Sequence, residues 1–139
     1  MTALDTNVLI SLRSKDPTEN QLAAKALSVA SQKGSLCLCG IVYSELLGFP
    51  GRDSKEVRRF LLALDIEIDW QTEERDWELA GIAYQAYVNR RRTSGIGSSR
   101  RIATDFLIGA HALNRGYVLL TNDKGVYRTS FPSLKIQGY

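Results

Sequence analysis

The sequence predicts an α/β protein, a three-layer α/β/α sandwich in which a central parallel sheet of four or five strands lies between helices. Short apolar runs alternate with longer stretches whose apolar residues recur at helical spacing. Strands that alternate with helices form parallel sheets covered on both faces. The 139 residues, 44% hydrophobic and 24% charged, are expected to form a single domain over residues 1–139 with a sizeable core.

The individual elements follow from this apolar pattern and from residues that begin or end helices. Asp16-Pro17 begins a helix that Gly34 ends, and Asp53 has capping-box spacing to Glu56. Thr72 is followed by two glutamates, which favour the positive end of a helix dipole. The expected strands are residues 2–4, 35–39, 66–70, 117–121 and 134–136, and the expected longer helices are residues 17–33, 54–64, 72–88 and 102–114.

Bulk properties point to a cytoplasmic protein. The chain shows no signal-peptide pattern and no run of about 20 apolar residues, so no membrane partner is expected. Its net charge of +3 is too small to indicate a polyanionic partner by itself. Cys37 and Cys39 point to one face of a strand and are expected in the core. With one histidine in the sequence, they argue against a zinc site.

Four acidic residues stand where a strand or loop gives way to a helix. Asp5 and Asp123 follow apolar strands, whereas Glu45 and Asp105 lie in the first turns of helices. Ligands of open α/β sheets bind beyond the carboxyl ends of the strands, where these carboxylates would converge. Clustered carboxylates repel one another unless a cation is present, and hard cations favour oxygen ligands. The pattern predicts Mg²⁺ (or Mn²⁺) bound by Asp5, Glu45, Asp105 and Asp123.

Each acid taken singly also has an ordinary explanation. Asp5 is suited to cap a helix, Asp105 to complement a helix dipole, and Asp123 to form a turn. Glu45 is equally suited to a solvated helix position. These explanations account less well for all four acids at once, because a charged residue at the end of a hydrophobic strand costs free energy unless it has a partner.

Small polar residues beside the acids are candidates to orient them through hydrogen bonds. These residues are Thr6, Asn7, Ser44 and Thr121, each of which equally suits a cap or a turn. A divalent ion held by carboxylates activates water and stabilises charge during hydrolysis of a phosphodiester. The four acids are therefore the candidate catalytic residues of a phosphodiester hydrolase.

Five arginines bracket the Gly/Ser-rich residues 93–99 that lead to Asp105. They are Arg90, Arg91, Arg92, Arg100 and Arg101. Arginine binds phosphate through two parallel hydrogen bonds, so the cluster is a candidate RNA-binding surface. The alternative is a solvated helix end. His111 lies off the helix face that Asp105 occupies and is given no catalytic role.

Taken together, the motifs resemble those of PIN-domain proteins, above all the VapC type of bacterial toxin. The resemblance spans the chain and is carried by residues 4–10 (Leu-Asp-Thr-Asn-Val-Leu-Ile), 43–47 (Tyr-Ser-Glu-Leu-Leu), 104–112 (Thr-Asp-Phe-Leu-Ile-Gly-Ala-His-Ala), 120–123 (Leu-Thr-Asn-Asp) and the tail 125–132. It implies a PIN-like fold and a Mg²⁺- or Mn²⁺-dependent endoribonuclease, with the same four acids as ligands. It also implies an RNA substrate, a homodimer and a cognate antitoxin.

Three other functions remain open. The first is a housekeeping RNA-processing or DNA-cleaving nuclease without an antitoxin. The second is a phosphatase with Asp5 as nucleophile, a reading weakened because Asn7 stands where the general acid of an Asp-x-Asp-x-Thr motif belongs. The third is a non-catalytic RNA-binding module that uses the arginines.

Overall fold

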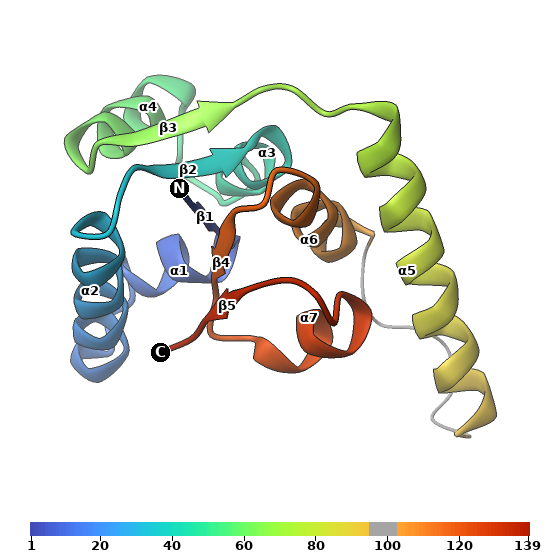
Figure 1. The fold of residues 1–139 in the computed structure, drawn as a ribbon. Helices are drawn as coiled ribbons and strands as arrows, with labels where there is room; N and C mark the ends of the chain where they lie inside the picture. The colour runs from blue at the N-terminus through green and yellow to red at the C-terminus, as the bar shows by residue number, and fades with distance from the viewer. Residues whose placement is uncertain (95–102) are drawn as a thin grey trace.

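Five parallel strands form the central sheet, in the order β3–β2–β1–β4–β5, with helices on both sides of it (Figure 1). The structure is a computed structural model and describes residues 1–94 and 103–139. The strands are β1 (Thr2–Leu4), β2 (Leu36–Cys39), β3 (Ile66–Asp69), β4 (Val118–Leu120) and β5 (Ile136–Gln137). This confirms the predicted α/β class and its parallel sheet.

Seven helices are found in the part of the chain that the structure describes. They are α1 (Thr6–Ser11), α2 (Pro17–Ser31), α3 (Gly40–Leu47), α4 (Ser54–Ala63), α5 (Glu74–Thr93), α6 (Thr104–Asn114) and α7 (Lys124–Ser130). Helix α5 packs along α6 and also contacts α7, whereas α1 contacts α2 and α3 (Figure 1). None of the described helices is long and apolar enough to cross a bilayer.

The middle of the sheet is the core of the molecule. Strands β1 and β2 are buried along their whole length, and Leu119 and Leu120 of β4 are buried beside them. Cys37 and Cys39 are buried free cysteines, as predicted. Burial raises the pKa of Cys37 to about 12, so its thiol stays protonated at neutral pH and is unsuited to bind a metal.

The register of the sheet brings the carboxyl ends of its central strands to one edge. Leu4 pairs with Leu120, and the next residue, Asp5, donates its backbone N–H to Leu120 O at 3.1 Å. Ala3 pairs with Cys37, so the carboxyl end of β2 lies at the same edge of the sheet as the end of β1. Residues that follow these strands therefore meet at the same edge, as expected for an open α/β sheet.

Several predicted boundaries differ from the structure. Helix α5 begins after Glu73 rather than at Thr72, because Glu73 and Asp76 form a capping box. Its last residue is Thr93 rather than residue 88. Strand β5 lies at Ile136–Gln137, since Leu134 is buried in the core instead. Of the helix predicted over 102–114, residues 104–114 are helical and residue 102 lies outside the described residues.

Candidate active site

Asp5 is the centre of a hydrogen-bond network at the end of β1. Its side chain is buried, and its Oδ2 accepts hydrogen bonds from Thr121 Oγ1 at 2.7 Å and from Asn7 Nδ2 at 2.6 Å. Asn7 Nδ2 lies 3.0 Å from Thr121 Oγ1 as well, and Asn7 Oδ1 accepts from the backbone N–H of Asn122 at 3.2 Å. Two polar neighbours named from the sequence, Asn7 and Thr121, thus orient the Asp5 carboxylate.

The pKa of Asp5 is raised above its ordinary value. Burial is the largest cause, and the nearby Asp105 carboxylate raises the pKa further, whereas the hydrogen bond from Thr121 and the adjacent Tyr127 hydroxyl lower it. The surroundings of Asp5 therefore disfavour the ionised form of its carboxyl group. A cation in the cleft would relieve this repulsion.

Glu45 is held in the same region by Thr6. The Thr6 hydroxyl donates a hydrogen bond to Glu45 Oε2, which links the first residue of α1 to the second turn of α3. Glu45 stands later in its helix than the first turn predicted from the sequence. Thr6 itself is buried, so this contact fixes Glu45 at the cleft rather than in solvent.

One cleft brings the four predicted acids together. It has a volume of about 530 Å³, and its lining includes Asp5, Glu45, Asp105 and Asp123. Asp105 is the second residue of α6, and Asp123 directly precedes α7. The backbone N–H of Asp123 donates to Thr121 Oγ1 at 3.0 Å, which connects the fourth acid to the Asp5 network. The convergence expected from the sequence is therefore present in the structure.

The donor set of this cleft fits a hard divalent cation, although the side chains are not already gathered around one point. Among the described residues, no three Asp, Glu, His or Cys side chains stand close enough to form a ready-made metal site. The four carboxylates that line the cleft are oxygen donors, as Mg²⁺ and Mn²⁺ prefer. They would have to turn toward one another to hold an ion.

Tyr127 of α7 was missed by the sequence-based prediction. Its side chain is 1% exposed, and its hydroxyl makes no hydrogen bond of good geometry with any described residue. Burial raises its pKa well above the ordinary value, and the Asp5, Asp105 and Asp123 carboxylates raise it further. The spacing of Asp123 and Tyr127, one helical turn apart, was the sequence signal that could have located it.

Not every predicted residue reaches the cleft. Ser44 is exposed and does not line it, because Ser44 and Glu45 are neighbours on a helix and project about 100° apart. Arg92 is exposed at the end of α5. Arg100 and Arg101 lie outside the described residues. The role predicted for Ser44 therefore has no support in the geometry.

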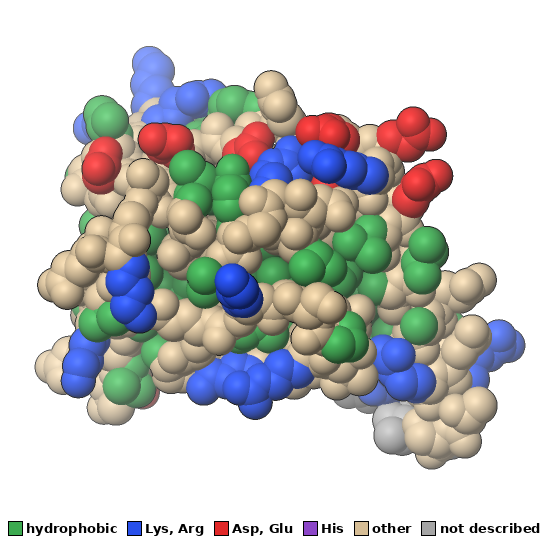
Figure 2. Space-filling view, viewed as in Figure 1, with side chains coloured by type: hydrophobic (Ala, Val, Ile, Leu, Met, Phe, Trp, Pro, Cys, Tyr) green, Lys and Arg blue, Asp and Glu red, His purple; other side chains and the backbone are tan. Residues whose placement is uncertain are grey.

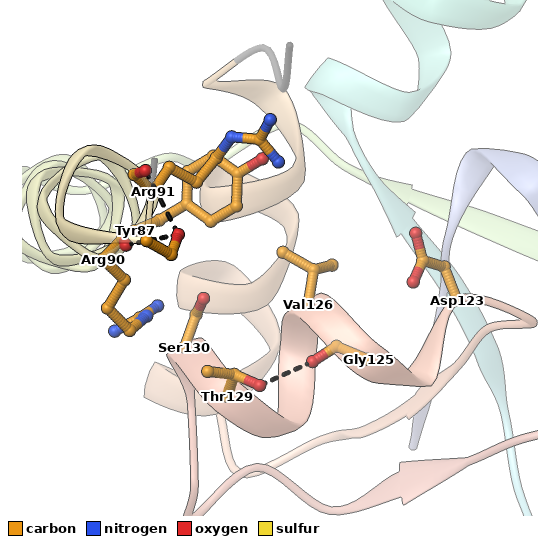
Figure 3. Close-up of a pocket in the computed structure, with 9 residues that line it drawn as sticks. Tyr87, Arg90, Arg91, Asp123, Gly125, Val126, Thr129 and Ser130 are labelled. Carbon is orange, nitrogen blue, oxygen red and sulfur yellow. Dashed lines mark hydrogen bonds between the residues drawn. The ribbon is translucent and has the colours of Figure 1, made fainter. Parts of the chain in front are cut away.

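Arg90 and Arg91 line a second pocket, which adjoins the acidic cleft. It lies between the last turns of α5 and helix α7 (Figure 3). Asp123 lines both cavities. Acidic side chains gather along the edge where α5 begins, and basic side chains lie around the end where α5 stops (Figure 2). Because Asp123 lines both cavities, Arg90 and Arg91 place positive charge beside the acidic cleft.

His111 belongs to a different network. It is buried, and its Nε2 lies 3.0 Å from Asp69 Oδ2. Burial and the neighbouring Arg115 lower its pKa, so the contact is a hydrogen bond of a neutral imidazole rather than an ion pair. Arg115 also contacts Asp76 at 3.0 Å and Asp69 at 2.8 Å. These residues do not line the acidic cleft.

The fold and the cleft define a class of protein: a parallel α/β/α sandwich with clustered acids at the carboxyl edge of its sheet. The sequence matches the PIN domain over residues 2–132, and the chain belongs to the PIN-domain family. None of the curated proteins is similar enough in sequence to count as a match.

Solved structures share the whole fold at low sequence identity. VapBC2 from Rickettsia felis, bound to a DNA fragment from its promoter, is 20% identical with a TM-score of 0.64, over 99% of this chain and 97% of the other. VapBC-1 from nontypeable Haemophilus influenzae is 21% identical with a TM-score of 0.64, over 99% and 96%. A toxin–antitoxin complex from Klebsiella pneumoniae is 19% identical with a TM-score of 0.66, over 96% and 95%.

Proposed function

We propose that the protein is a metal-dependent endoribonuclease that acts as a VapC-type toxin. The observation that carries the proposal is the single cleft lined by Asp5, Glu45, Asp105 and Asp123, with Asp5 held by Asn7 and Thr121. PIN-domain membership supports nuclease chemistry in general. The similar solved structures are toxin–antitoxin complexes, which supports the toxin role and an antitoxin partner.

The cleft residues have distinct roles in this mechanism. The four carboxylates of the cleft would hold Mg²⁺ or Mn²⁺, which would activate the attacking water and neutralise charge on the phosphate. Asp5 is kept in one orientation by two hydrogen bonds, and Glu45 by the hydroxyl of Thr6. Asp105 and Asp123 complete the acidic set from the beginnings of two helices. Arg90 and Arg91 draw the RNA backbone toward these carboxylates.

The nuclease activity is tested with purified protein and cellular RNA. Cleavage is expected with Mg²⁺ or Mn²⁺, and EDTA is expected to stop it. Asp5→Asn should lower the cleavage rate by more than the 10- to 100-fold typical of residues that only support a metal ligand. Glu67→Gln is the matched control, because Glu67 is an exposed acid outside the cleft. Intact RNA under every metal condition would refute the proposal.

The toxin role has its own test. Expression of the unmodified chain should arrest growth, and Asp5→Asn should relieve the arrest. The gene neighbourhood should contain a small upstream reading frame for a DNA-binding protein, and co-expression of that protein should restore growth and give a co-purifying complex. Cleavage without growth arrest and without such a gene would instead indicate a housekeeping nuclease. The size of the purified protein would test the expected homodimer.

A further inference from the structure

The pocket beside the acidic cleft has the chemistry of a nucleotide-binding site. Its volume is about 420 Å³. Helix α5 contributes Tyr87, Arg90 and Arg91, and α7 contributes Thr129 and Ser130 (Figure 3). Guanidinium groups bind phosphate, while hydroxyl and aromatic groups bind sugars and bases. The pocket therefore presents the groups that one nucleotide of an RNA strand requires.

Contacts inside the pocket hold these groups in place. The Arg91 guanidinium lies over the Tyr87 ring, with Cζ 5.8 Å from the ring centroid (Figure 3). Both arginines lie in the last turn of α5, where the helix dipole favours positive charge. Less conformational freedom is lost on binding when a side chain is already held in this way.

Two hydroxyl groups on α7 differ in their hydrogen bonding. Thr129 Oγ1 donates to Gly125 O at 2.9 Å and is satisfied within its own helix (Figure 3). Ser130 Oγ is buried at the floor of the pocket and has no partner among the described residues. A buried hydroxyl without a partner costs about 1–3 kcal/mol. A ligand in the pocket could supply the missing partner after a rotation of Ser130.

We propose that this pocket binds the nucleotide next to the cleaved phosphodiester, with Arg90 and Arg91 on its phosphate. The inference rests on the proposed nuclease function, because Asp123 lines the pocket as well as the cleft. It divides the arginine cluster that the sequence suggested. Arg90 and Arg91 bind RNA at this pocket, whereas Arg92, which does not line it, contributes only general positive charge.

The salt dependence of RNA binding tests this division. Affinity of a short RNA is measured by fluorescence anisotropy at several salt concentrations, in the Asp5→Asn protein so that no cleavage occurs. Arg90→Gln and Arg91→Gln are each expected to weaken binding and to lower the slope of log affinity against log salt by about one. Arg92→Gln, on the same helix, is the matched control and should change the slope less.

The outcomes separate the two proposals. Equal slopes for all three arginine variants overturn the pocket assignment, even if the unmodified protein cleaves RNA. Failure of the unmodified protein to cleave refutes the nuclease proposal, whatever the slopes are. Shortening the RNA from each end shows which side of the cleaved bond occupies the pocket. Removing that nucleotide should weaken binding when Arg90 is present and should have no further effect on affinity in Arg90→Gln.

A second inference rests on the buried hydroxyl of Tyr127. The Asp5 carboxylate accepts its two well-formed hydrogen bonds through Oδ2 alone. The Tyr127 hydroxyl, enclosed beside Asp5, has no partner of good geometry among the described residues. We infer that Tyr127 is a positioning residue that donates to Asp5 when a divalent cation is bound. This inference also rests on the proposed metal-dependent function.

Tyr127→Phe tests this role because it removes only the hydroxyl. The Mn²⁺ affinity, measured by electron paramagnetic resonance, is expected to fall about 10- to 100-fold. The Tm of the metal-free protein should not fall, since the hydroxyl that is removed makes no hydrogen bond of good geometry with the described residues. Tyr139→Phe is the control, because the Tyr139 hydroxyl is also buried with no partner of good geometry in the described part of the chain, but it lies outside the cleft.

An unchanged Mn²⁺ affinity in Tyr127→Phe would overturn the inference while leaving the metal site intact. A fall in the metal-free Tm larger than that of Tyr139→Phe would show a structural role instead. If the unmodified protein binds no Mn²⁺, both the inference and the metal-dependent function are refuted.

Discussion

Gly109 of α6 packs directly against the ring of Phe131, the residue that follows α7. A Cβ built on Gly109 would come within 2.3 Å of Phe131 Cε2. The contact lets α6, which begins next to Asp105, pack closely against the segment that leaves α7. The relative placement of Asp105 and Tyr127 therefore depends on a position where no side chain fits.

Gly109→Ala is expected to lower the free energy of unfolding by about 1–3 kcal/mol, because the added methyl group forces Phe131 or a helix to move. Urea denaturation measures the change. Gly81→Ala on α5 is the control, since a Cβ there meets nothing within 4 Å. It should raise the stability by about 0.5–1 kcal/mol through helix propensity. A Gly109→Ala protein as stable as Gly81→Ala would contradict this packing.

The stability of the protein should fall as the pH drops through the range in which His111 titrates. Burial lowers its pKa below 6.5, so the unfolded chain binds a proton more readily than the folded protein. The contribution of neutral His111 is complete above pH 6.5 and is lost progressively below it. His111→Gln should flatten the Tm profile between about pH 7 and 5. Parallel profiles for the two proteins would disprove this linkage.

Removing Arg115 should destabilise the protein far more than removing a surface arginine. Burial raises the pKa of Asp76, but hydrogen bonds from Asn114, the Glu73 backbone and Arg115 outweigh it, so the net pKa is lowered. Arg115→Met leaves this buried charge without its cation and should cost about 3–5 kcal/mol. Arg13→Met, which breaks the half-exposed pair with Glu56, should cost less than about 1 kcal/mol. Similar losses in chemical denaturation would argue against a buried ion pair.

Asp5→Asn should make the metal-free protein more stable at neutral pH and abolish stabilisation by metal. Burial raises the Asp5 pKa, so the ionised folded state is penalised above the unfolded pKa of about 3.8. In the unmodified protein, Mn²⁺ at 100 times its Kd should add about 2.7 kcal/mol, and EDTA should reverse the gain. Thermal unfolding with and without Mn²⁺ checks both effects. If Asp5→Asn is less stable than the unmodified protein without metal, burial of the ionised Asp5 carboxylate does not cost free energy.

The meeting of the acidic residues at one cleft could be predicted from local pattern. Asp5 directly follows a buried strand, and Asp105 begins an apolar helix, so the topology of a parallel sheet is enough to bring them together. The position of Ser44 outside the cleft could not be predicted, because adjacency in sequence does not show which residue of a helix faces a cleft.

Helix α7 and Tyr127 escaped prediction for a related reason. The helix has seven residues, with Gly125, Val126 and Thr129 among them, and these residues favour helices weakly. Its stability comes from packing against α5 and α6, which no local pattern reveals. The placement of Tyr127 beside the acids depends on that packing.

The hydrogen bond between Asp5 and Thr121 joins residues 116 positions apart, within a sheet whose central strand, β1, precedes the other four strands in the sequence. A nascent chain that has not reached β4 lacks Thr121 and Asp123, and its Asp5 has no strand on one side. Such distant pairings also form slowly during folding. The acidic cleft, and with it the proposed nuclease centre, therefore forms only after the chain has been synthesised beyond Asp123.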